Sequence, residues 1–571
     1  MSGPDASPQT LLDVLRGAAR RRPDGGVRVF RGGDEVERLT HTELLDQAGR
    51  IASGLLEGPG EAGGRRIALV FPNSGEFLQA FFGTVAAGAV PVPLPPPLRF
   101  SSRQRYGQRV QGALLRSRVG CLLTTEKLLP SLRALVASLG LRTRVLSLAA
   151  VRRGLPSWAP VAPDDSALIQ YTSGSTAAPR GAVLTHRQVV ANLAAIRRGL
   201  DMREDDVSAS WLPLFHDMGL IGCFLGALSG AIEQLLAPPE DFVRDPLTWL
   251  RVMTRHAATL MTAPNWGYSH CAQRVGPEQA RTLDLSRVRV ALNGAEMVDR
   301  GTTEAFTTRF RVAGFRAEAM LPVYGLAEAG LAVAFPRLGR GVKSVRVRRH
   351  ALGEGVVEPA RPEEANTREV VSVGRPVEGL EIALLGADGE RLSESRVGEI
   401  LVRGASVMVG YDEDPAATGA AFHEGWLRTG DLGFRFDGEL YVTGRQKDLI
   451  IVRGENFYAH DVEALAAGVP GVWARQAMAV GLPGDGTEEL VVFAETRTRE
   501  PAWCDGIVRA ISESVAGTLG IAPRDVVLCR PGELPRTTSG KLERYRVGEV
   551  YSRWRGESSA RFSGRPICST G

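Results

Sequence analysis

The sequence predicts an α/β protein with a large N-terminal domain and a small α+β C-terminal domain. The chain has 571 residues, which is too long for a single hydrophobic core. Apolar runs of strand length alternate with helical patterns over most of the chain, which favours layers of helices on parallel strands. The pattern changes around a charged Gly-Arg-Gln-Lys-Asp segment. We therefore place the large domain at 1–443, a boundary segment at 444–448, the small domain at 449–546 and a tail at 547–571.

Spacing and helix-breaking residues predict the elements of the large domain. Ser7 and Pro8 are typical of a helix N-terminus, and the apolar spacing that follows them ends at Pro23. Further helices are predicted at 76–87 and 187–200, and strands at 66–71, 121–123, 167–171 and 288–292. The proline-rich run 91–97 is predicted to be a stiff extended connection, because proline fixes φ and has no amide hydrogen. Binding of an SH3-like domain is the alternative interpretation of this run.

The small domain is predicted from a second set of short elements. A strand at 439–443 closes the large domain and a strand at 449–452 opens the small one. A helix at 461–467 that ends at Gly468, strands at 477–481 and 490–495, and a helix at 503–519 follow. The residues from about 551 onward are rich in Arg, Ser and Gly and have no apolar period, so we expect a mobile tail.

Composition narrows the class of protein. With 44% hydrophobic and 23% charged residues, the chain is typical of globular proteins. The net charge is +5, but Asp and Glu are interleaved with the basic residues, so we expect no nucleic-acid partner. None of the six cysteines forms a Cys-x-x-Cys pair, and no apolar stretch is long enough to cross a bilayer. We expect a cytoplasmic enzyme without a transmembrane segment.

A loop rich in small and hydroxyl residues follows the predicted strand 167–171. Its sequence, YTSGSTAAPRG, supplies backbone amides, hydroxyls and one cation that could bind the phosphates of a nucleotide. The predicted ligands are Thr172, Ser173, Gly174, Ser175, Thr176 and Arg180. The spacing is not that of a Walker A loop. A surface turn is the alternative interpretation of the loop taken alone.

Four more motifs follow in order: VYGLAEAG at 323–330, LRTGDLG at 427–433, GRQKDLIIVRG at 444–454 and PRTTSGKLER at 535–544. With the loop, they resemble the ordered motifs of the adenylate-forming superfamily, which includes acyl-CoA synthetases, luciferases and the adenylation domains of peptide synthetases. The resemblance covers residues 10–546. It implies an enzyme that uses ATP and Mg²⁺ to convert a carboxylic acid into an acyl adenylate.

The resemblance also implies roles for individual residues. Glu328 is expected to hold Mg²⁺ together with Thr172, and Asp431 to accept hydrogen bonds from the ribose hydroxyls beside Arg445. Lys541 is expected to bridge the carboxylate of the acid and the α-phosphate, and Lys447 to lie at the hinge of the small domain. The nucleotide is expected to contact two further stretches, which consist of Gly294, Ala295 and Glu296 and of Tyr324, Gly325, Leu326 and Ala327.

One segment indicates a branch of the superfamily. The sequence SWLPLFHDMGLIG at 210–222 resembles the fatty acyl-AMP ligases. It suggests His216 as a catalytic gate between the nucleotide and the acyl chain, although a lone histidine is more often structural. Substrate-pocket residues are expected at Trp211, His216, Asp217, Met218, Trp266 and Gly330. Residues 342–369 occupy the place of an insertion that, in this branch, disfavours coenzyme A as acceptor; a hairpin without consequence is the alternative.

Some residues depart from the family pattern. Ala177 stands where glycine is usual in the phosphate loop, and Arg180 stands where lysine is usual. Arginine keeps the charge but presents a planar fork of donors, so phosphate binding is expected to survive with altered geometry. Gly330 replaces a hydroxyl residue and Trp266 replaces phenylalanine, so we expect Gly330 to widen the acyl pocket and Trp266 to shorten it.

The expected function is ATP-dependent activation of a fatty or related carboxylic acid as acyl-AMP. The acyl group would then pass to the phosphopantetheine thiol of a separate acyl carrier protein, for polyketide or lipopeptide biosynthesis. Two alternatives use another acceptor: an acyl-CoA ligase uses coenzyme A, and a second type of adenylating enzyme uses an amine. A third alternative, a catalytically silent binding protein, conflicts with the presence of Glu328, Asp431 and Lys541.

Overall fold

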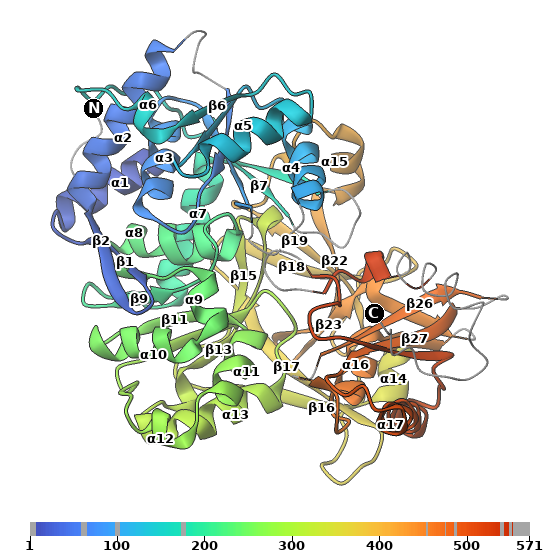
Figure 1. The fold of residues 1–571 in the computed structure, drawn as a ribbon. Helices are drawn as coiled ribbons and strands as arrows, with labels where there is room; N and C mark the ends of the chain where they lie inside the picture. The colour runs from blue at the N-terminus through green and yellow to red at the C-terminus, as the bar shows by residue number, and fades with distance from the viewer. Residues whose placement is uncertain are drawn as a thin grey trace.

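The computed structural model describes residues 7–58, 65–97, 103–172, 179–452, 455–473, 476–484, 488–536, 542–547 and 551. Figure 1 shows a large part, coloured blue to yellow, and a small orange and red part beside it. Three sheets form the frame of the large part, with helices packed between and around them. Within the described segments, no helix is both long enough and apolar enough to cross a membrane.

The first helix begins three residues later than the sequence predicts. Helix α1 spans Leu11–Arg21, and Thr10, not Ser7, is its N-cap. The Thr10 side chain accepts a hydrogen bond from the Asp13 amide, and Asp13 accepts one from the Thr10 amide at 3.0 Å. This reciprocal pair satisfies two amides that the first turn leaves unpaired, an arrangement that Ser7 and Pro8 do not offer.

A parallel sheet near the N-terminus has the strand order β4-β3-β5-β6. Its strands are β3 (Arg66–Val70), β4 (Val90–Leu94), β5 (Cys121–Thr124) and β6 (Arg144–Ser147). Helices α2 (His41–Glu57), α3 (Gly75–Ala86), α4 (Arg103–Arg116), α5 (Leu129–Ser138) and α6 (Leu148–Val151) belong to this region. It meets the expectation of parallel strands alternating with helices.

The proline-rich run is not only a connection, because its first half is strand β4. The amide of Val90 donates to the Arg65 carbonyl at 2.8 Å, so the amides of alternate residues along β4 face strand β3. Pro91 and Pro93 fall between them and face away from the sheet. Since β4 is the edge of the sheet, no hydrogen bond is lost to the missing amide hydrogens.

The central sheet has the strand order β13-β12-β11-β9-β10-β1-β2. Its strands are β1 (Gly26–Arg31), β2 (Asp34–Thr40), β9 (Val207–Ser210), β10 (Glu233–Leu236), β11 (Leu260–Pro264), β12 (Val290–Gly294) and β13 (Met320–Pro322). All pairs are parallel except β1 with β2. An aromatic-rich core packs it against α9 (Pro239–Arg244), α10 (Pro246–Arg255), α11 (Asn265–Arg274) and α13 (Arg300–Phe310). The apolar face of α7 (His186–Gly199) joins the main core of the large part.

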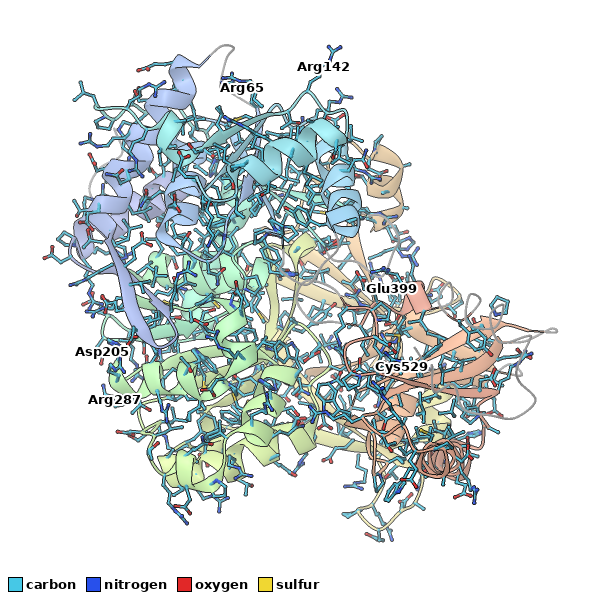
Figure 2. All side chains as sticks on the ribbon, viewed as in Figure 1. Arg65, Arg142, Asp205, Arg287, Glu399 and Cys529 are labelled. Carbon is cyan, nitrogen blue, oxygen red and sulfur yellow. The ribbon has the colours of Figure 1, made fainter. Side chains whose placement is uncertain are left out.

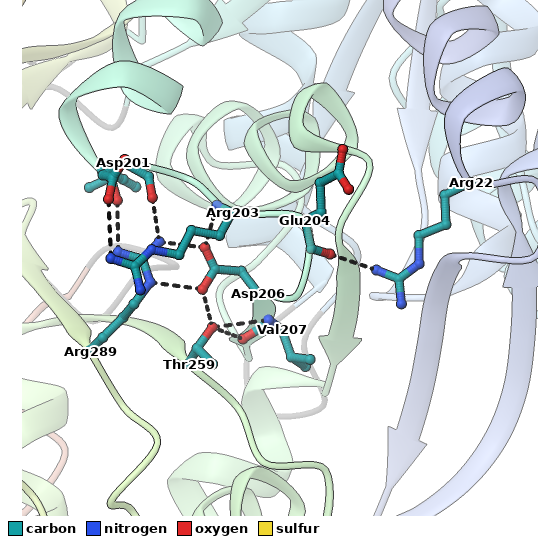
Figure 3. A network of polar contacts seen from close by, with 9 residues as sticks. Arg22, Asp201, Arg203, Glu204, Asp206, Val207, Thr259 and Arg289 are labelled. Carbon is teal, nitrogen blue, oxygen red and sulfur yellow. Dashed lines mark hydrogen bonds and ion pairs between the residues drawn. The ribbon is translucent and has the colours of Figure 1, made fainter.

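A buried ion pair ties the end of α7 to the central sheet (Figure 3). The Arg289 guanidinium contacts Asp206 and also donates to the carbonyls of Leu200 and Asp201, both at 2.9 Å. The Asp206 carboxylate accepts a further hydrogen bond of 2.6 Å from the Thr259 hydroxyl. The side chain of Asp206 is 2% exposed, so these partners replace the water that its charge has lost.

The third sheet lies next to the small part and has the order β14-β15-β17-β23-β22-β19-β18. Its strands are β14 (Tyr324–Leu326), β15 (Leu331–Phe335), β17 (Thr367–Pro376), β18 (Leu380–Leu385), β19 (Gly398–Gly404), β22 (Trp426–Phe436) and β23 (Glu439–Arg445). The segment 342–369 contributes β16 (Ser344–Arg348), helix α14 (Arg349–Gly353) and the start of β17. The segment therefore contains strand and short helix.

The small part contains the elements that the sequence predicts, which are β24 (Leu449–Val452), α16 (Ala459–Ala467), β26 (Ala477–Pro483), β27 (Glu488–Glu495) and α17 (Pro501–Leu519). It also contains two strands that were not predicted, β25 (Glu455–Tyr458) and β28 (Asp525–Cys529). Its two main apolar clusters consist of residues from Ile450 onward. A turn of 3₁₀-helix at Gln446–Asp448 joins it to β23. Apart from Tyr551, the tail predicted to be mobile after residue 551 lies outside the described residues.

Candidate active site

A cavity of about 1580 Å³ lies between the third sheet, the central sheet and the small part. Its wall combines segments that are far apart in the sequence, from Tyr171 to Arg544. The predicted site residues that line it are Thr172, Arg180, His216, Asp217, Met218, Trp266, Ala295, Glu296, Tyr324, Gly325, Leu326, Ala327, Glu328, Asp431, Arg445 and Lys447. The fold thus brings most of the predicted site to one place.

A β-hairpin holds both ends of the predicted phosphate loop. Strands β7 (Ser166–Tyr171) and β8 (Gly181–Thr185) are antiparallel, and the Thr172 amide donates to the Arg180 carbonyl at 2.9 Å. The Arg180 guanidinium lies 5.3 Å from the centre of the Tyr411 ring. The intervening predicted ligands Ser173, Gly174, Ser175 and Thr176, and the unusual Ala177, lie outside the described residues.

Glu328 follows strand β14 and projects its carboxylate into the cavity. The Tyr411 hydroxyl donates to Glu328 Oε1 at 3.0 Å, and the Glu328 carbonyl accepts from the Met408 amide at 2.8 Å. Burial raises the pKa of Glu328, and the nearby charge of Asp217 acts in the same direction. The hydrogen bond from Tyr411 opposes this rise because it stabilises the ionised carboxylate.

Asp431 lies on β22 directly opposite Arg445 on β23. The Arg445 Nε donates to Asp431 Oδ1 at 3.0 Å, and the Tyr324 hydroxyl donates to Asp431 Oδ2 at 2.7 Å. The charge of Asp431 raises the pKa of Arg445, with burial acting against it. Each carboxylate oxygen has a second lone pair, so Asp431 can still accept two hydroxyl donors.

Glu399 supports this part of the site and was not predicted from the sequence. Figure 2 shows it in the interior near the small part, whereas Arg142 and Arg287 lie at the outer edge of the molecule. Its carboxylate receives hydrogen bonds from Arg428 at 2.6 Å and from the Gly430 amide at 3.1 Å. These contacts hold the turn that presents Asp431.

Residues 294–296, which are expected to contact the nucleotide, begin at the end of β12 and approach α11. The Glu296 carboxylate accepts from the Trp266 amide at 2.5 Å, at the N-terminus of α11, where a negative charge is favourable. Ala295 has a φ of 67°, a left-handed conformation that is unusual for alanine. Gly294 does not line the cavity; a Cβ on it would lie 2.7 Å from Val323 Cγ2, so its small size serves packing.

Two further predicted pocket residues lie away from the cavity wall. Trp211 is 2% exposed and stacks on Phe242 with ring centres 3.8 Å apart. Gly330 has a φ of 77°, and a Cβ on it would lie 3.0 Å from the Ser406 carbonyl oxygen. Glycine at 330 therefore satisfies a backbone requirement next to Ser406, and its expected effect on the acyl pocket stays a prediction.

Met218 begins the π-helix Met218–Leu225, Asp217 is its N-cap, and His216 directly precedes the cap. The Asp217 carboxylate caps it through a hydrogen bond of 2.7 Å from the Met218 amide. All three side chains border the cavity. The π-helical geometry, which is common at functional sites, sets their orientation.

Two residues of the small part, one on each side of the segment 537–541, line the cavity. Arg536 and Leu542 pair as an isolated antiparallel bridge, and both line the cavity. Lys541 lies outside the described residues, but it is the immediate neighbour of Leu542. Lys447 lines the same cavity from the 3₁₀-turn between the two parts.

Two arginines of the segment 342–369 hold the small part, a contact that the sequence did not reveal. Arg349 pairs with Asp461 at 2.7 Å, and Arg368 pairs with Asp461 at 3.3 Å while also contacting His460. Arg368 is 5% exposed, lies 4.7 Å over the Tyr458 ring and donates to the Thr443 carbonyl at 2.8 Å. Burial acts to raise the pKa of Asp461, but the arginines and His460 lower it overall.

Among the described residues, no three His, Cys, Asp or Glu side chains come together as a metal site. Mg²⁺ does not require such a cluster, because it commonly binds one or two carboxylates together with the phosphates of a nucleotide. Glu328 borders the cavity, and the Tyr411 hydroxyl donates to its Oε1, so its carboxylate offers its other lone pairs for this mode of binding.

Comparison with known proteins identifies the family. The model of the family described as "AMP-binding enzyme" matches residues 15–412. The chain is an AMP-binding enzyme. It is 33% identical over 568 residues, covering 95% of each chain, to the medium-chain-fatty-acid–[acyl-carrier-protein] ligase JamA of Moorena producens. It is 35% identical over 555 residues, again 95% of each chain, to a putative acyl-CoA synthetase of Caulobacter vibrioides.

Solved structures agree with the fold class that the sequence predicts for this AMP-binding enzyme. A structure from a study of fatty acyl-adenylate ligases of E. coli and L. pneumophila superimposes with a TM-score of 0.91 at 33% identity, covering 96% of this chain and 99% of the other. The predicted membership of the adenylate-forming superfamily, with relatives among the fatty acyl-AMP ligases, is therefore confirmed.

The cavity of the AMP-binding enzyme also has an apolar section. It is formed by α7, the π-helix and β15, and its residues are Ile196, Leu200, Met218, Gly222, Leu331, Ala332 and Phe335. It begins three residues after Glu328 in the sequence. A charged centre and an apolar section thus share one cavity.

Proposed function

We propose that this enzyme converts a fatty or related carboxylic acid and ATP into acyl-AMP and pyrophosphate. The acyl group then passes to the phosphopantetheine thiol of a separate acyl carrier protein. The observation that carries the proposal is the shared cavity, in which Glu328 and the Asp431–Arg445 pair lie beside an apolar section. An anionic nucleotide can bind at the charged centre while the aliphatic part of an acid binds in the apolar section, so the two can react in one cavity.

The nucleotide would be held from three sides. Asp431 would accept the ribose hydroxyls through its remaining lone pairs, with Tyr324 and Arg445 fixing the carboxylate. Thr172 and Arg180 would contact phosphates at the two ends of the loop, with Ser173, Gly174, Ser175 and Thr176 between them. Glu296 and its neighbours would border the adenine.

A magnesium ion would be held by Glu328, with Thr172 and the phosphates of ATP completing its ligands. When bound, Mg²⁺ supplies positive charge that screens the phosphates from the attacking carboxylate. The chain's own contribution is the hydrogen bond from Tyr411, which favours the ionised form of Glu328 that a cation binds.

The chemical step is an in-line displacement at the α-phosphorus. A carboxylate oxygen of the acid forms a bond to phosphorus as the bond to the pyrophosphate oxygen breaks, and the electron pair leaves with pyrophosphate. No general base is needed, because the carboxylic acid is already ionised at pH 7. Lys541 would stabilise the negative charge at the reacting centre, Arg445 would hold the nucleotide, and His216 would orient the acid carboxylate.

Two observations support a carrier protein as the acceptor. A relative with 33% identity carries an acyl-carrier-protein ligase name. In addition, Arg349 and Arg368 of the segment 342–369 bind Asp461 of the small part, so this segment acts on the part of the chain expected to move. We place the mobile unit at 449–546 and its hinge at 444–448, with Lys447 at the centre.

Coenzyme A is a second candidate acceptor. The relative with 35% identity is named a putative acyl-CoA synthetase. The same cavity would form the adenylate in either case, so the two candidates differ only in the second half of the reaction.

The first experiment measures acid-dependent exchange of labelled pyrophosphate into ATP, with acids of increasing chain length. We expect exchange with the wild type and none with Asp431→Ala, whereas Arg337→Ala, on the outer surface, serves as a control. The second experiment supplies free coenzyme A or a phosphopantetheinylated carrier protein and detects the thioester by mass spectrometry. Failure of every acid to support exchange in folded protein would refute the ligase assignment, and transfer to coenzyme A alone would refute the carrier.

A further inference from the structure

The end of the apolar section is set by one aromatic side chain. Phe335, the last residue of β15, lines the cavity and also lines a second pocket of about 320 Å³. The second pocket lies beyond the C-terminal end of α7, and Arg198, Arg337 and Arg375 border it. The Phe335 ring is therefore a partition between an apolar interior and a charged outer pocket.

The position of this ring is fixed from behind. A Cβ on Gly199 would lie 2.7 Å from Phe335 Cδ2, so the ring rests directly on the glycine at the end of α7. A Cβ on Gly374 would lie 2.2 Å from the backbone of Phe335, which shows that β17 also approaches closely. Because both glycines pack closely against Phe335, its ring has a defined position and cannot move away from the cavity without a shift of the backbone.

The opposite end of β15 carries local strain. Leu331 has a φ of 124°, which is unfavourable for a branched side chain, and it lines the cavity. A Cβ on Gly222 would lie 2.8 Å from Leu331 Cδ2, so Gly222 leaves room for the leucine. Strain of this kind persists only where the surrounding structure imposes it and is concentrated at functional sites.

We propose that Phe335 determines the longest acyl chain that the enzyme accepts. The inference rests on the proposed function, because it takes the apolar section as the place of the acyl chain. Leu331 and Phe335 are four residues apart along a strand, which separates them by roughly 13 Å. A chain that enters beside Leu331 runs toward Phe335 and stops at the ring. A longer chain would have to displace the ring and enter a pocket bordered by charged side chains of both signs, three arginines together with Glu378 and Glu439, where an apolar group gains little.

The inference predicts opposite effects for two substitutions. Phe335→Ala opens the partition and admits longer acids. Gly199→Ala places a methyl group against the ring, pushes it into the apolar section and excludes the longest acids that the wild type accepts. Each methylene of an acyl chain changes kcat/KM by about tenfold or more when a pocket can or cannot bury it.

The test measures kcat/KM for pyrophosphate exchange with straight-chain acids from butyric to stearic acid. For the wild type we expect a steep fall beyond one chain length. In Phe335→Ala this fall moves to longer acids, and the ratio of the first excluded acid to the last accepted one rises about tenfold. Gly199→Ala moves it to shorter acids, and Arg337→Ala, which changes the outer pocket only, leaves it in place.

Circular dichroism and thermal unfolding verify that each variant folds, and Phe335→Leu replaces Phe335→Ala if the alanine variant does not. A fall that stays at the same chain length in a folded Phe335 variant overturns the inference while leaving the ligase assignment intact. A wild type that exchanges pyrophosphate with no acid overturns the proposed function, and with it the inference. The two failures are therefore separate results.

Discussion

Tyr324 fixes the carboxylate of Asp431, because its hydroxyl donates to Asp431 Oδ2 at 2.7 Å. Tyr324 is buried and precedes Glu328 by four residues. One short segment thus orients the carboxylate proposed for ribose and carries the carboxylate proposed for magnesium. Substitutions in this segment can separate the two roles.

Tyr324→Phe is expected to raise the KM for ATP about tenfold, because a buried carboxylate oxygen loses its donor. The effect on kcat is expected to be smaller, since the ring still fills its place. Steady-state kinetics with ATP as the varied substrate measures both constants. Tyr106→Phe is the matched control, since the Tyr106 hydroxyl donates to the Pro95 carbonyl far from the cavity. An unchanged KM in Tyr324→Phe would contradict the proposed role of Asp431.

Tyr411→Phe is expected to move the acidic limb of the pH profile to higher pH. Burial already raises the pKa of Glu328, and the hydrogen bond from Tyr411 partly opposes this increase. Loss of the hydroxyl favours the protonated carboxyl group, so the pKa rises further and Mg²⁺ binding is lost at a higher pH. The measurement is kcat/KM as a function of pH at saturating Mg²⁺. A limb that stays in place or moves to lower pH would argue against Glu328 as the titrating group.

Arg368→Leu is expected to loosen the small part without unfolding the large one. The substitution leaves Asp461 with fewer partners and removes the contact to the Thr443 carbonyl at the entrance to the hinge. Breaking one side of a buried ion pair costs about 3–5 kcal/mol. Hydrogen exchange should therefore become faster in α16.

The same variant is expected to transfer acyl groups to coenzyme A more readily than the wild type, if the segment 342–369 restrains the small part. Arg346→Leu provides the control within this segment, since Arg346 contacts only Glu369, at 3.9 Å, among the ion pairs described. Equal exchange rates in both variants would indicate that the Arg368 contact does not restrain α16.

Arg289→Leu is expected to lower the free energy of unfolding of the large part by about 3–5 kcal/mol, because Asp206 keeps a buried charge without its main partner. Urea unfolding followed by tryptophan fluorescence measures this change. Arg187→Ala removes an exposed pair with Asp164, and it should change stability far less because solvent screens this pair. Similar effects of the two substitutions would show that the network of Figure 3 is not a structural anchor.

The sequence predicted the alternating elements well where local signals are strong. The strand at 66–71 and the helix at 76–87 agree with β3 and α3 to within one residue at each end. Helix α1 was placed too early because Ser7 and Thr10 both suit an N-cap, and only the contact between Thr10 and Asp13 decides between them. Strand β4 was missed because prolines exclude a central strand but not an edge strand.

The sequence motifs predicted the main residues of the site, but they did not predict the residues that hold these side chains in position. Glu328, Asp431 and Arg445 belong to ordered motifs, and the structure places all three in one cavity. Tyr411 could not be inferred, because it reaches Glu328 from a short strand 83 residues away. The backbone requirement at Gly330 could not be inferred for a similar reason: its neighbour Ser406 is distant in the sequence, so its left-handed backbone conformation had no local signal.

Strand β4 also has a consequence for the phosphate loop. It packs beside β7, the strand that leads into the loop, yet the two belong to different sheets. Pro91 and Pro93 have no amide hydrogens to donate at the free edge of β4. They therefore prevent a ladder of backbone hydrogen bonds that would join the two sheets. The hairpin β7–β8 therefore stays outside the larger sheets, and its largely buried strands hold the two ends of the phosphate loop in place.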